Sequence, residues 1–307
     1  MTDLPMIGIR LALYVLLMLL TGLAAFPLYT LHHGERANRL FATIFAPAQR
    51  WLCGSGLLVS TAGMVVLTAN MHGVGLFSVE PAMLRTMLVD TAMGAAWLVR
   101  TIALLVAAIA AWNLAKRPRT ATAILAVAGS AALATLAWSG HAGASEGATG
   151  TIHRLADILH LIAAAIWVGA IAAFLFLLRP ARDRPHSKNI ALAARSLDRF
   201  GRVGTICVLV ITATGLVNAQ IIVGLENATR SIASTYGQLL LGKLALFASM
   251  LALAAANRWR LTPALKAASI DGDPGAAATS IRRSIGAEAT AAGAILILVA
   301  WFGTLEP

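Results

Sequence analysis

Charged residues are scarce in this sequence, since Asp, Glu, Lys and Arg together make up 12% of its 307 residues. A soluble domain carries about 25% of such residues. Hydrophobic residues, in contrast, account for 59% of the chain. This balance excludes a soluble globular protein and indicates a chain that lies mostly within a lipid bilayer.

Cysteine and the familiar catalytic motifs are also missing or nearly so. The two cysteines, Cys53 and Cys207, lie in apolar segments without CxxC spacing, so we expect them to pack in the core and not to hold a metal. The sequence contains no GxSxG, no Walker loop and no HExxH motif, which excludes the reactions that those motifs carry. We therefore expect that the protein is not an enzyme.

What the chain does contain is eight long apolar segments, each close to the roughly 20 residues that a membrane-spanning helix needs. They cover residues 5–31, 51–71, 88–113, 120–140, 152–178, 202–224, 236–257 and 285–305. The first is too long for a signal peptide and carries Asp3 before it. The expected fold is all-α: one membrane domain over residues 1–307, built as a polytopic bundle of eight transmembrane helices.

The net charge of +11 is distributed unevenly between the loops. Lys and Arg concentrate after the first, third, fifth and seventh segments, whereas the opposite loops hold only Arg85, Arg154 and Arg230. By the positive-inside rule, the basic loops face the cytoplasm and both termini face the periplasm. The basic excess is thus explained by topology and contact with membrane lipid, and nucleic acid is not an expected partner.

Short sequence words recur between the two halves of the chain. "GLAAF" at 22–26 resembles "AIAAF" at 170–174, and "LLVSTAG" at 57–63 resembles "LVITATG" at 209–215. These pairs predict a parallel internal repeat of four plus four helices, with halves 1–143 and 144–307. Parallel repeats occur in transporters, whose binding sites lie at the interface between the repeats.

The fifth segment carries three ionisable residues, His153, Asp157 and His160. Spacings of four and three place them on one helical face. Each such group costs roughly 2.5–3.5 kcal/mol in lipid, so this face should contact protein or water. The supporting polar residues Arg100, Asn218 and Lys243 lie at a similar depth, about 9–13 Å below the outer surface at the helical rise.

Histidine and methionine also gather near the expected outer rim, at Met71, His72 and His141. Thioethers suit Cu(I), and imidazole suits copper in either oxidation state. We therefore predict a copper ion, Cu(I) or Cu(II), that is captured at the rim and received by the three residues of the fifth segment. Only neutral imidazole binds copper, so loading should weaken below the unperturbed histidine pKa of about 6.5.

Three alternatives remain open at this point. In a purely structural network, Asp157 would pair with Arg100 or Lys243. A haem-binding or redox protein could use histidine ligands, with the same basic residues bound to propionates. However, His153 and His160 leave the same helix face and cannot occupy opposite axial positions on one iron. A third possibility is a protein that binds copper without transporting it.

Several longer stretches resemble the copper resistance protein D (CopD) family of bacterial inner-membrane proteins. They are "LADILHLIAAAIWVGAIAAF", "LDRFGRVG", "TATGLVNA", "YGQLLLGKLALF" and "RRSIGAEA". The resemblance is densest over residues 152–300, and "TAMGAAWLVR" and "SGHAG" extend it upstream.

This resemblance implies eight spans, copper homeostasis and passage of copper across the bacterial inner membrane. It further implies a periplasmic copper-binding partner of the CopC type. The family's characteristic polar residues correspond to His160 before "WVG", His141 in "GHA" and Lys243 in "LGK".

Overall fold

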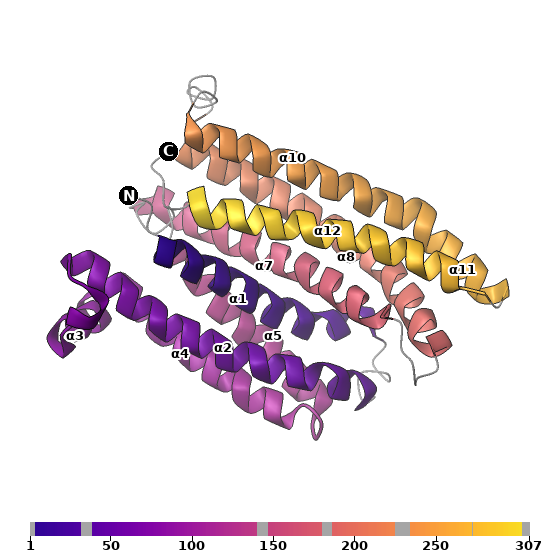
Figure 1. Cartoon of the computed structure of the whole chain (residues 1–307), viewed down its shortest axis with the longest axis horizontal. Helices are drawn as coiled ribbons and strands as arrows, with labels where there is room; N and C mark the ends of the chain where they lie inside the picture. The colour runs from indigo at the N-terminus through magenta and orange to yellow at the C-terminus, as the bar shows by residue number, and fades with distance from the viewer. Residues whose placement is uncertain are drawn as a thin grey trace.

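The computed structural model describes residues 4–31, 39–139, 147–179, 186–224, 234–271 and 273–302, which are almost entirely helical (Figure 1). The long helices are α1 (Leu4–Thr30), α2 (Arg39–His72), α4 (Ala92–Asn113), α5 (Pro118–Ala134), α7 (Gly147–Leu177), α8 (His186–Ile222), α10 (Thr235–Ala256) and α12 (Gly275–Phe302). Shorter elements are η2 (Leu76–Ser78), α3 (Pro81–Asp90), η3 (Thr135–Trp138), η5 (Asn257–Leu261) and α11 (Thr262–Asp271). Eight helical stretches are long and apolar enough to cross a membrane, which confirms the predicted all-helical, eight-span bundle.

Several helices extend well beyond the apolar segments that predicted them. Helix α8 begins at His186 instead of residue 202, and α12 begins at Gly275 instead of residue 285. The added turns of α8 are amphipathic: Ile190, Ala193 and Ala194 are buried at helical spacing, and α11 packs against this helix. Hydropathy identifies the lipid-embedded part of a helix, so it misses extensions that pack against protein through one apolar face.

The third span begins later than expected, at Ala92 instead of residue 88. The preceding residues form the separate helix α3, which starts with Pro81 and ends at Asp90. Thr91 lies between the two helices, and its hydroxyl accepts a hydrogen bond from the Gly94 backbone N–H at 3.0 Å. This N-cap satisfies an otherwise unpaired donor and sets the start of α4.

Helices α1 and α7 cross at the centre of the bundle through a contact between two glycines. A Cβ atom on Gly22 would lie 2.7 Å from the Gly169 Cα and closer still to the Ala165 carbonyl oxygen, and one on Gly169 would strike the Gly22 backbone. Close approach of this kind is typical of membrane helices with small residues at the interface. One turn further on, the rings of Phe26 and Phe174 meet edge to face at 5.2 Å.

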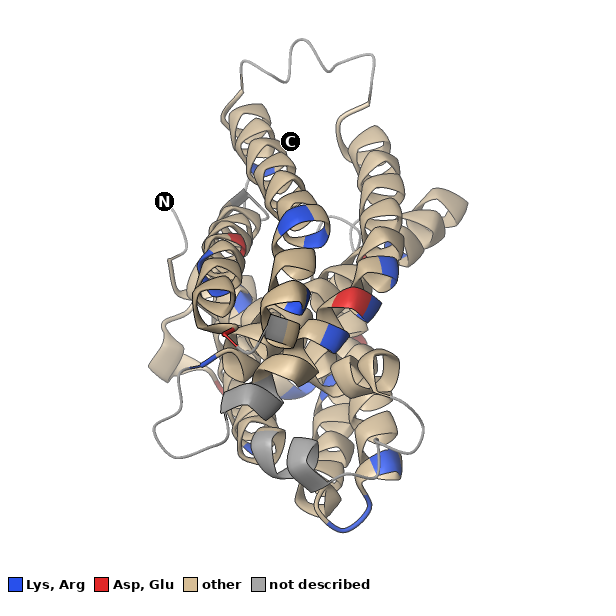
Figure 2. Cartoon of the chain, turned by 90° about the vertical axis from the view of Figure 1, so that its right-hand side faces the viewer, with Lys and Arg blue, Asp and Glu red and all other residues tan. Residues whose placement is uncertain are grey.

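The other long helices divide between these two central ones. Helices α2 and α5 pack against α1, and α4 packs against both of them; α8 and α12 pack against α7, and α10 packs against α12 (Figure 1). Helix α1 begins and α12 ends at the same end of the bundle, on the left in Figure 1. Figure 2 views the opposite end, where many Lys and Arg positions lie. We call this opposite end the basic end.

Candidate metal-binding cavity

The three ionisable residues of α7 line a cavity of about 170 Å³ between α7, α8, α10, α12 and α1. The other polar residues in its wall are Asn218 of α8, Tyr236 and Lys243 of α10, and Arg10 and Tyr14 of α1. We call it the histidine cavity. Since a water molecule occupies about 30 Å³ in the liquid, this volume can hold an ion with several waters. The structure therefore brings together His153, Asp157, His160, Asn218 and Lys243.

The polar face of α7 is directed into the protein. His153 is 2% exposed, whereas Ile152, Leu155 and Leu159 on the other side of the helix are each more than half exposed. These three apolar residues face outward, where a bilayer would contact them. Because ionisable groups are costly in lipid, the inward orientation explains how α7 accommodates three of them.

His160 has a defined hydrogen-bonding arrangement. Its Nδ1 lies 3.0 Å from the Thr214 hydroxyl oxygen, and that hydroxyl donates its own proton to the Val210 carbonyl at 2.6 Å. Thr214 therefore accepts a proton from Nδ1, and in the neutral form of the ring the lone pair then lies on Nε2. A histidine held through one nitrogen so that the other can bind a metal is common in metal sites.

The cavity wall carries one carboxylate, two basic side chains and one acceptor without a hydrogen-bond partner. Asp157 is the only carboxylate among the described residues that line it, and it lies within electrostatic reach of Lys243 and Arg10. The Asn218 Oδ1 is buried and has no hydrogen-bond partner. An unsatisfied buried acceptor costs about 1–3 kcal/mol, so a donor or cation in the cavity would stabilise this arrangement.

A complete metal-ligand set is not assembled in the described structure. Among the described residues, no group of three or more His, Cys, Asp and Glu side chains could hold a metal ion. His153 and His160 are seven residues apart, or about 10.5 Å along the helix axis. A further expected ligand, His141, lies outside the described residues.

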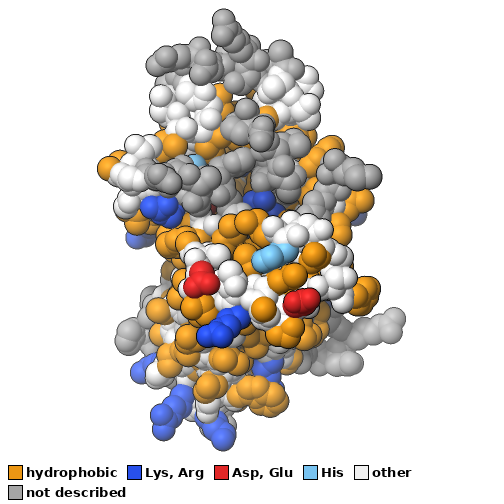
Figure 3. Space-filling view, turned by 90° about the vertical axis from the view of Figure 1, so that its left-hand side faces the viewer, with side chains coloured by type: hydrophobic (Ala, Val, Ile, Leu, Met, Phe, Trp, Pro, Cys, Tyr) orange, Lys and Arg blue, Asp and Glu red, His pale blue; other side chains and the backbone are white. Residues whose placement is uncertain are grey.

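The expected rim ligands on α2 lie apart from the histidine cavity and do not line it. Met71 is 61% exposed, and the His72 Nδ1 donates to the Thr68 carbonyl at 3.0 Å. Both residues are at the C-terminal end of α2. Figure 3 shows the end of the bundle where α1 begins. The described part of this surface carries hydrophobic side chains with scattered charged and histidine side chains among them. Capture of copper by Met71 and His72 stays a prediction.

Arg100 lies in a neighbouring cavity of about 210 Å³, formed by α1, α2, α4 and η3. It is buried, and its Nε donates to the Thr135 hydroxyl at 2.8 Å. Asp157 does not line this cavity, so Lys243, and not Arg100, shares the histidine cavity with it. Depth along a helix can be counted from sequence, but the side of the bundle that a residue faces cannot.

Sequence reasoning did not single out Arg10 or Thr214. Arg10 lines both cavities together with Tyr14, and its position inside a span was an available indication, because such residues mark functional sites by default. Thr214 orients His160 from another helix. Nothing in its local sequence indicates that contact.

Comparison with known proteins relates the chain to copper resistance proteins. Residues 1–151 match the family model "Copper resistance protein D-like, N-terminal domain", and residues 194–302 match "Copper resistance protein D". The chain is 40% identical to "Copper resistance protein D" of Pseudomonas syringae pv. tomato, over 100% of this chain and 98% of the relative. These matches confirm the family indicated by the sequence motifs.

Two further relatives bear on location and function. "Inner membrane protein YebZ" of Escherichia coli K12 is 29% identical over 98% of both chains. "Copper transport protein CutJ" of Bacillus subtilis 168 is 31% identical over 80% of this chain but only 44% of the relative. The chain is a multi-pass protein of the bacterial inner membrane, and it belongs to the copper resistance protein D family.

Proposed function

We propose that this protein binds copper in the histidine cavity and passes it across the inner membrane, as part of copper homeostasis and resistance. The observation that carries the proposal is the inward face of α7, where His153 and His160 line one cavity with the unpaired Asn218 Oδ1. A relative named as a copper transport protein supports transport as the activity. In this account copper is the cargo, and the protein is not an enzyme.

The histidine cavity supplies neutral nitrogen ligands and one carboxylate. His160 would bind copper through Nε2, because Thr214 occupies its Nδ1. Asp157 would offset the charge of the ion, while Lys243 and Arg10 already contribute positive charge to the same wall. This balance favours the singly charged Cu(I) over Cu(II), and imidazole is an acceptable ligand for either.

The proposed orientation places the histidine cavity on the periplasmic side. Lys and Arg cluster at the basic end, which the positive-inside rule assigns to the cytoplasm. Both termini would then be periplasmic, and His72, Met71 and His141 would receive copper from a CopC-type protein. The central crossing of α1 and α7, whose sequences are similar, supports a parallel repeat of two four-helix halves.

Metal analysis and copper uptake into proteoliposomes test this function together. Purified protein should retain copper, and vesicles that contain it should accumulate copper faster than empty vesicles. If the purified protein retained copper but the vesicles accumulated it no faster than empty ones, the protein would bind copper without transporting it. A strong Soret band together with the absence of bound copper would instead show a haem protein.

Thr214→Val should weaken copper binding about 10- to 100-fold, the usual effect of removing a hydrogen-bond partner of a metal ligand. Valine keeps the shape of threonine but cannot accept the Nδ1 proton of His160. Equilibrium dialysis with Cu(I) under reducing conditions measures the affinity. Thr212→Val on the exposed face of α8 is the matched control, and equal affinities in the two variants would contradict the proposed role of Thr214.

A further inference from the structure

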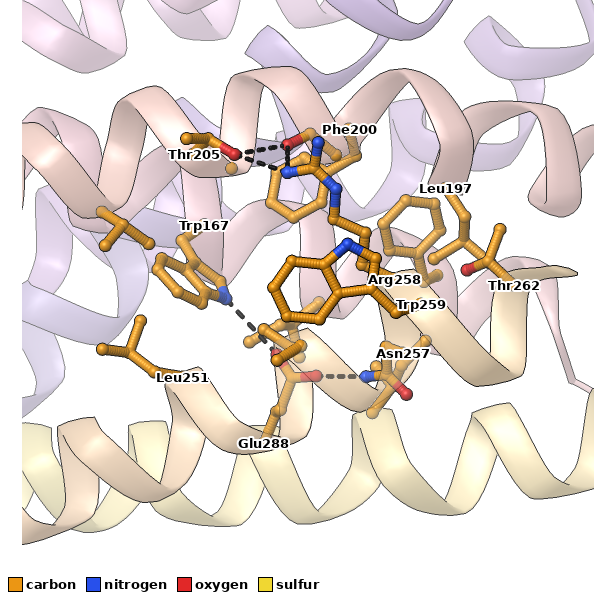
Figure 4. A pocket seen from close by; sticks show the side chains of 18 residues that line it. Trp167, Leu197, Phe200, Thr205, Leu251, Asn257, Arg258, Trp259, Thr262 and Glu288 are labelled. Carbon is orange, nitrogen blue, oxygen red and sulfur yellow. Dashed lines mark hydrogen bonds between the residues drawn. The ribbon is translucent and has the colours of Figure 1, made fainter.

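The same four helices α7, α8, α10 and α12, with η5, enclose a second and larger cavity towards the basic end (Figure 4). Its volume is about 320 Å³, and its wall includes Trp167, Asn257 and Glu288. We call it the glutamate cavity. Trp167 follows His160 by seven residues on α7, which is about 10.5 Å of helix. The two cavities therefore lie one above the other along the same helices.

Glu288 is a buried carboxylate whose hydrogen-bond partners are neutral. It is 4% exposed; Trp167 Nε1 donates to its Oε2 at 3.4 Å, and Asn257 Nδ2 donates to its Oε1 (Figure 4). Arg258 is the only other charged residue among those that line the cavity. Its guanidinium donates instead to the Gly201 carbonyl at 2.8 Å and the Thr205 hydroxyl at 2.6 Å.

Asn257 adds an acceptor that nothing in the described structure satisfies. The residue is 6% exposed, and its Oδ1 is buried without a hydrogen-bond partner. Its Nδ2 is committed to Glu288, so the amide cannot turn to relieve the Oδ1. Asn257 also opens the π-helical turn η5, and such turns are frequent at functional sites. A buried carboxylate beside an unpaired carbonyl oxygen is an arrangement that favours a cation or a strong hydrogen-bond donor.

The wall of the cavity selects a hard cation and not copper. The described lining residues include no histidine, cysteine or methionine, and their ligand atoms are oxygens. Soft ions such as Cu(I) prefer sulfur and imidazole ligands. One carboxylate matches one positive charge, so a monovalent ion fits best.

An aromatic pair lies between residues that line the two cavities. The Trp167 ring packs against Phe247 with centroids 6.3 Å apart and planes inclined at 63°. Phe247 lies on α10 between Lys243, which lines the histidine cavity, and Leu251, which lines the glutamate cavity. Trp167 therefore contacts both Phe247 and Glu288. A cation at Glu288 would compete for the carboxylate oxygen that Trp167 binds and release the ring.

We propose that the glutamate cavity binds a hard monovalent cation, a proton or Na⁺, through Glu288 and the Asn257 Oδ1, and that this ion is coupled to copper passage. The coupling role rests on the copper transport proposed above, whereas the cation site itself does not.

The test compares the wild type with Glu288→Gln in proteoliposomes, with copper uptake measured under an imposed proton gradient and, separately, under a Na⁺ gradient at fixed pH. One gradient should accelerate wild-type uptake about tenfold, within the usual range of coupling between sites. Glu288→Gln should abolish that acceleration yet bind as much copper in equilibrium dialysis. Asp198→Asn, an exposed carboxylate paired with Lys266 at the same end, should behave like the wild type.

Tryptophan fluorescence of the copper-free protein gives a second readout, since Trp167 donates to Glu288. The wild-type fluorescence should change on addition of NaCl or after a pH step, and both Glu288→Gln and Asn257→Leu should lose this change. That result would support the cation site even if the protein bound no copper and the transport proposal failed. Should Glu288→Gln not fold, Glu288→Asp must show a weakened response. An unchanged response in the variants, or equal acceleration of their uptake, overturns the proposal.

Discussion

The His160→Ala variant is expected to bind copper at least 100-fold more weakly than the wild type. Removing a partner of a metal ligand commonly costs 10- to 100-fold in affinity, and removing the ligand itself should cost at least as much. His160 is well suited to the role, because Thr214 fixes its ring and leaves Nε2 free for a metal. Equilibrium dialysis with Cu(I) provides the measurement.

A matched histidine replacement makes this result interpretable. His72→Ala removes an exposed ring that does not line the histidine cavity, so it should change the affinity of the cavity by less than about twofold. It should instead slow uptake if His72 captures copper at the rim. If His160→Ala bound copper as tightly as the wild type, His160 would not be a copper ligand.

The Gly169→Val variant should lose thermal stability or fail to assemble as a monodisperse protein. A side chain at this position strikes the Gly22 backbone of α1. Inserting extra atoms into a packed core typically costs 1–3 kcal/mol and occasionally more, and here the obstacle is backbone, which cannot rotate away. Size-exclusion chromatography and thermal unfolding in detergent measure the effect.

Gly293→Val is the control for this substitution. Gly293 is also in a membrane-spanning helix, α12, but a Cβ atom there meets nothing within 4 Å. It should therefore unfold within a few degrees of the wild type. Equal stability of the two valine variants would mean that α1 and α7 do not approach each other so closely.

The sequence predicted the number and type of the helices because apolar length is a local property that lipid imposes on each span. It also predicted that His153, Asp157 and His160 share a face, since helical spacing alone determines that. The amphipathic start of α8 was not predicted, because its apolar face is too sparse to register as a span. Packing partners from other helices, such as Thr214 and Arg10, depend on how the helices are arranged.

The two cavities suggest a division of tasks along one set of helices. The histidine cavity carries nitrogen ligands suited to copper, whereas the glutamate cavity carries oxygen ligands alone. The Trp167–Phe247 pair lies between residues of the two cavities, and the proposed cation at Glu288 would release its Trp167 ring. In this account the membrane helices supply the copper ligands and the coupling site.

X-ray absorption at the copper K edge of the loaded protein tests the central claim most directly. The account predicts the multiple-scattering pattern of imidazole ligands in the wild type, and its reduction in His160→Ala. A spectrum without imidazole scattering, or one that His160→Ala leaves unchanged, would contradict copper binding in the histidine cavity.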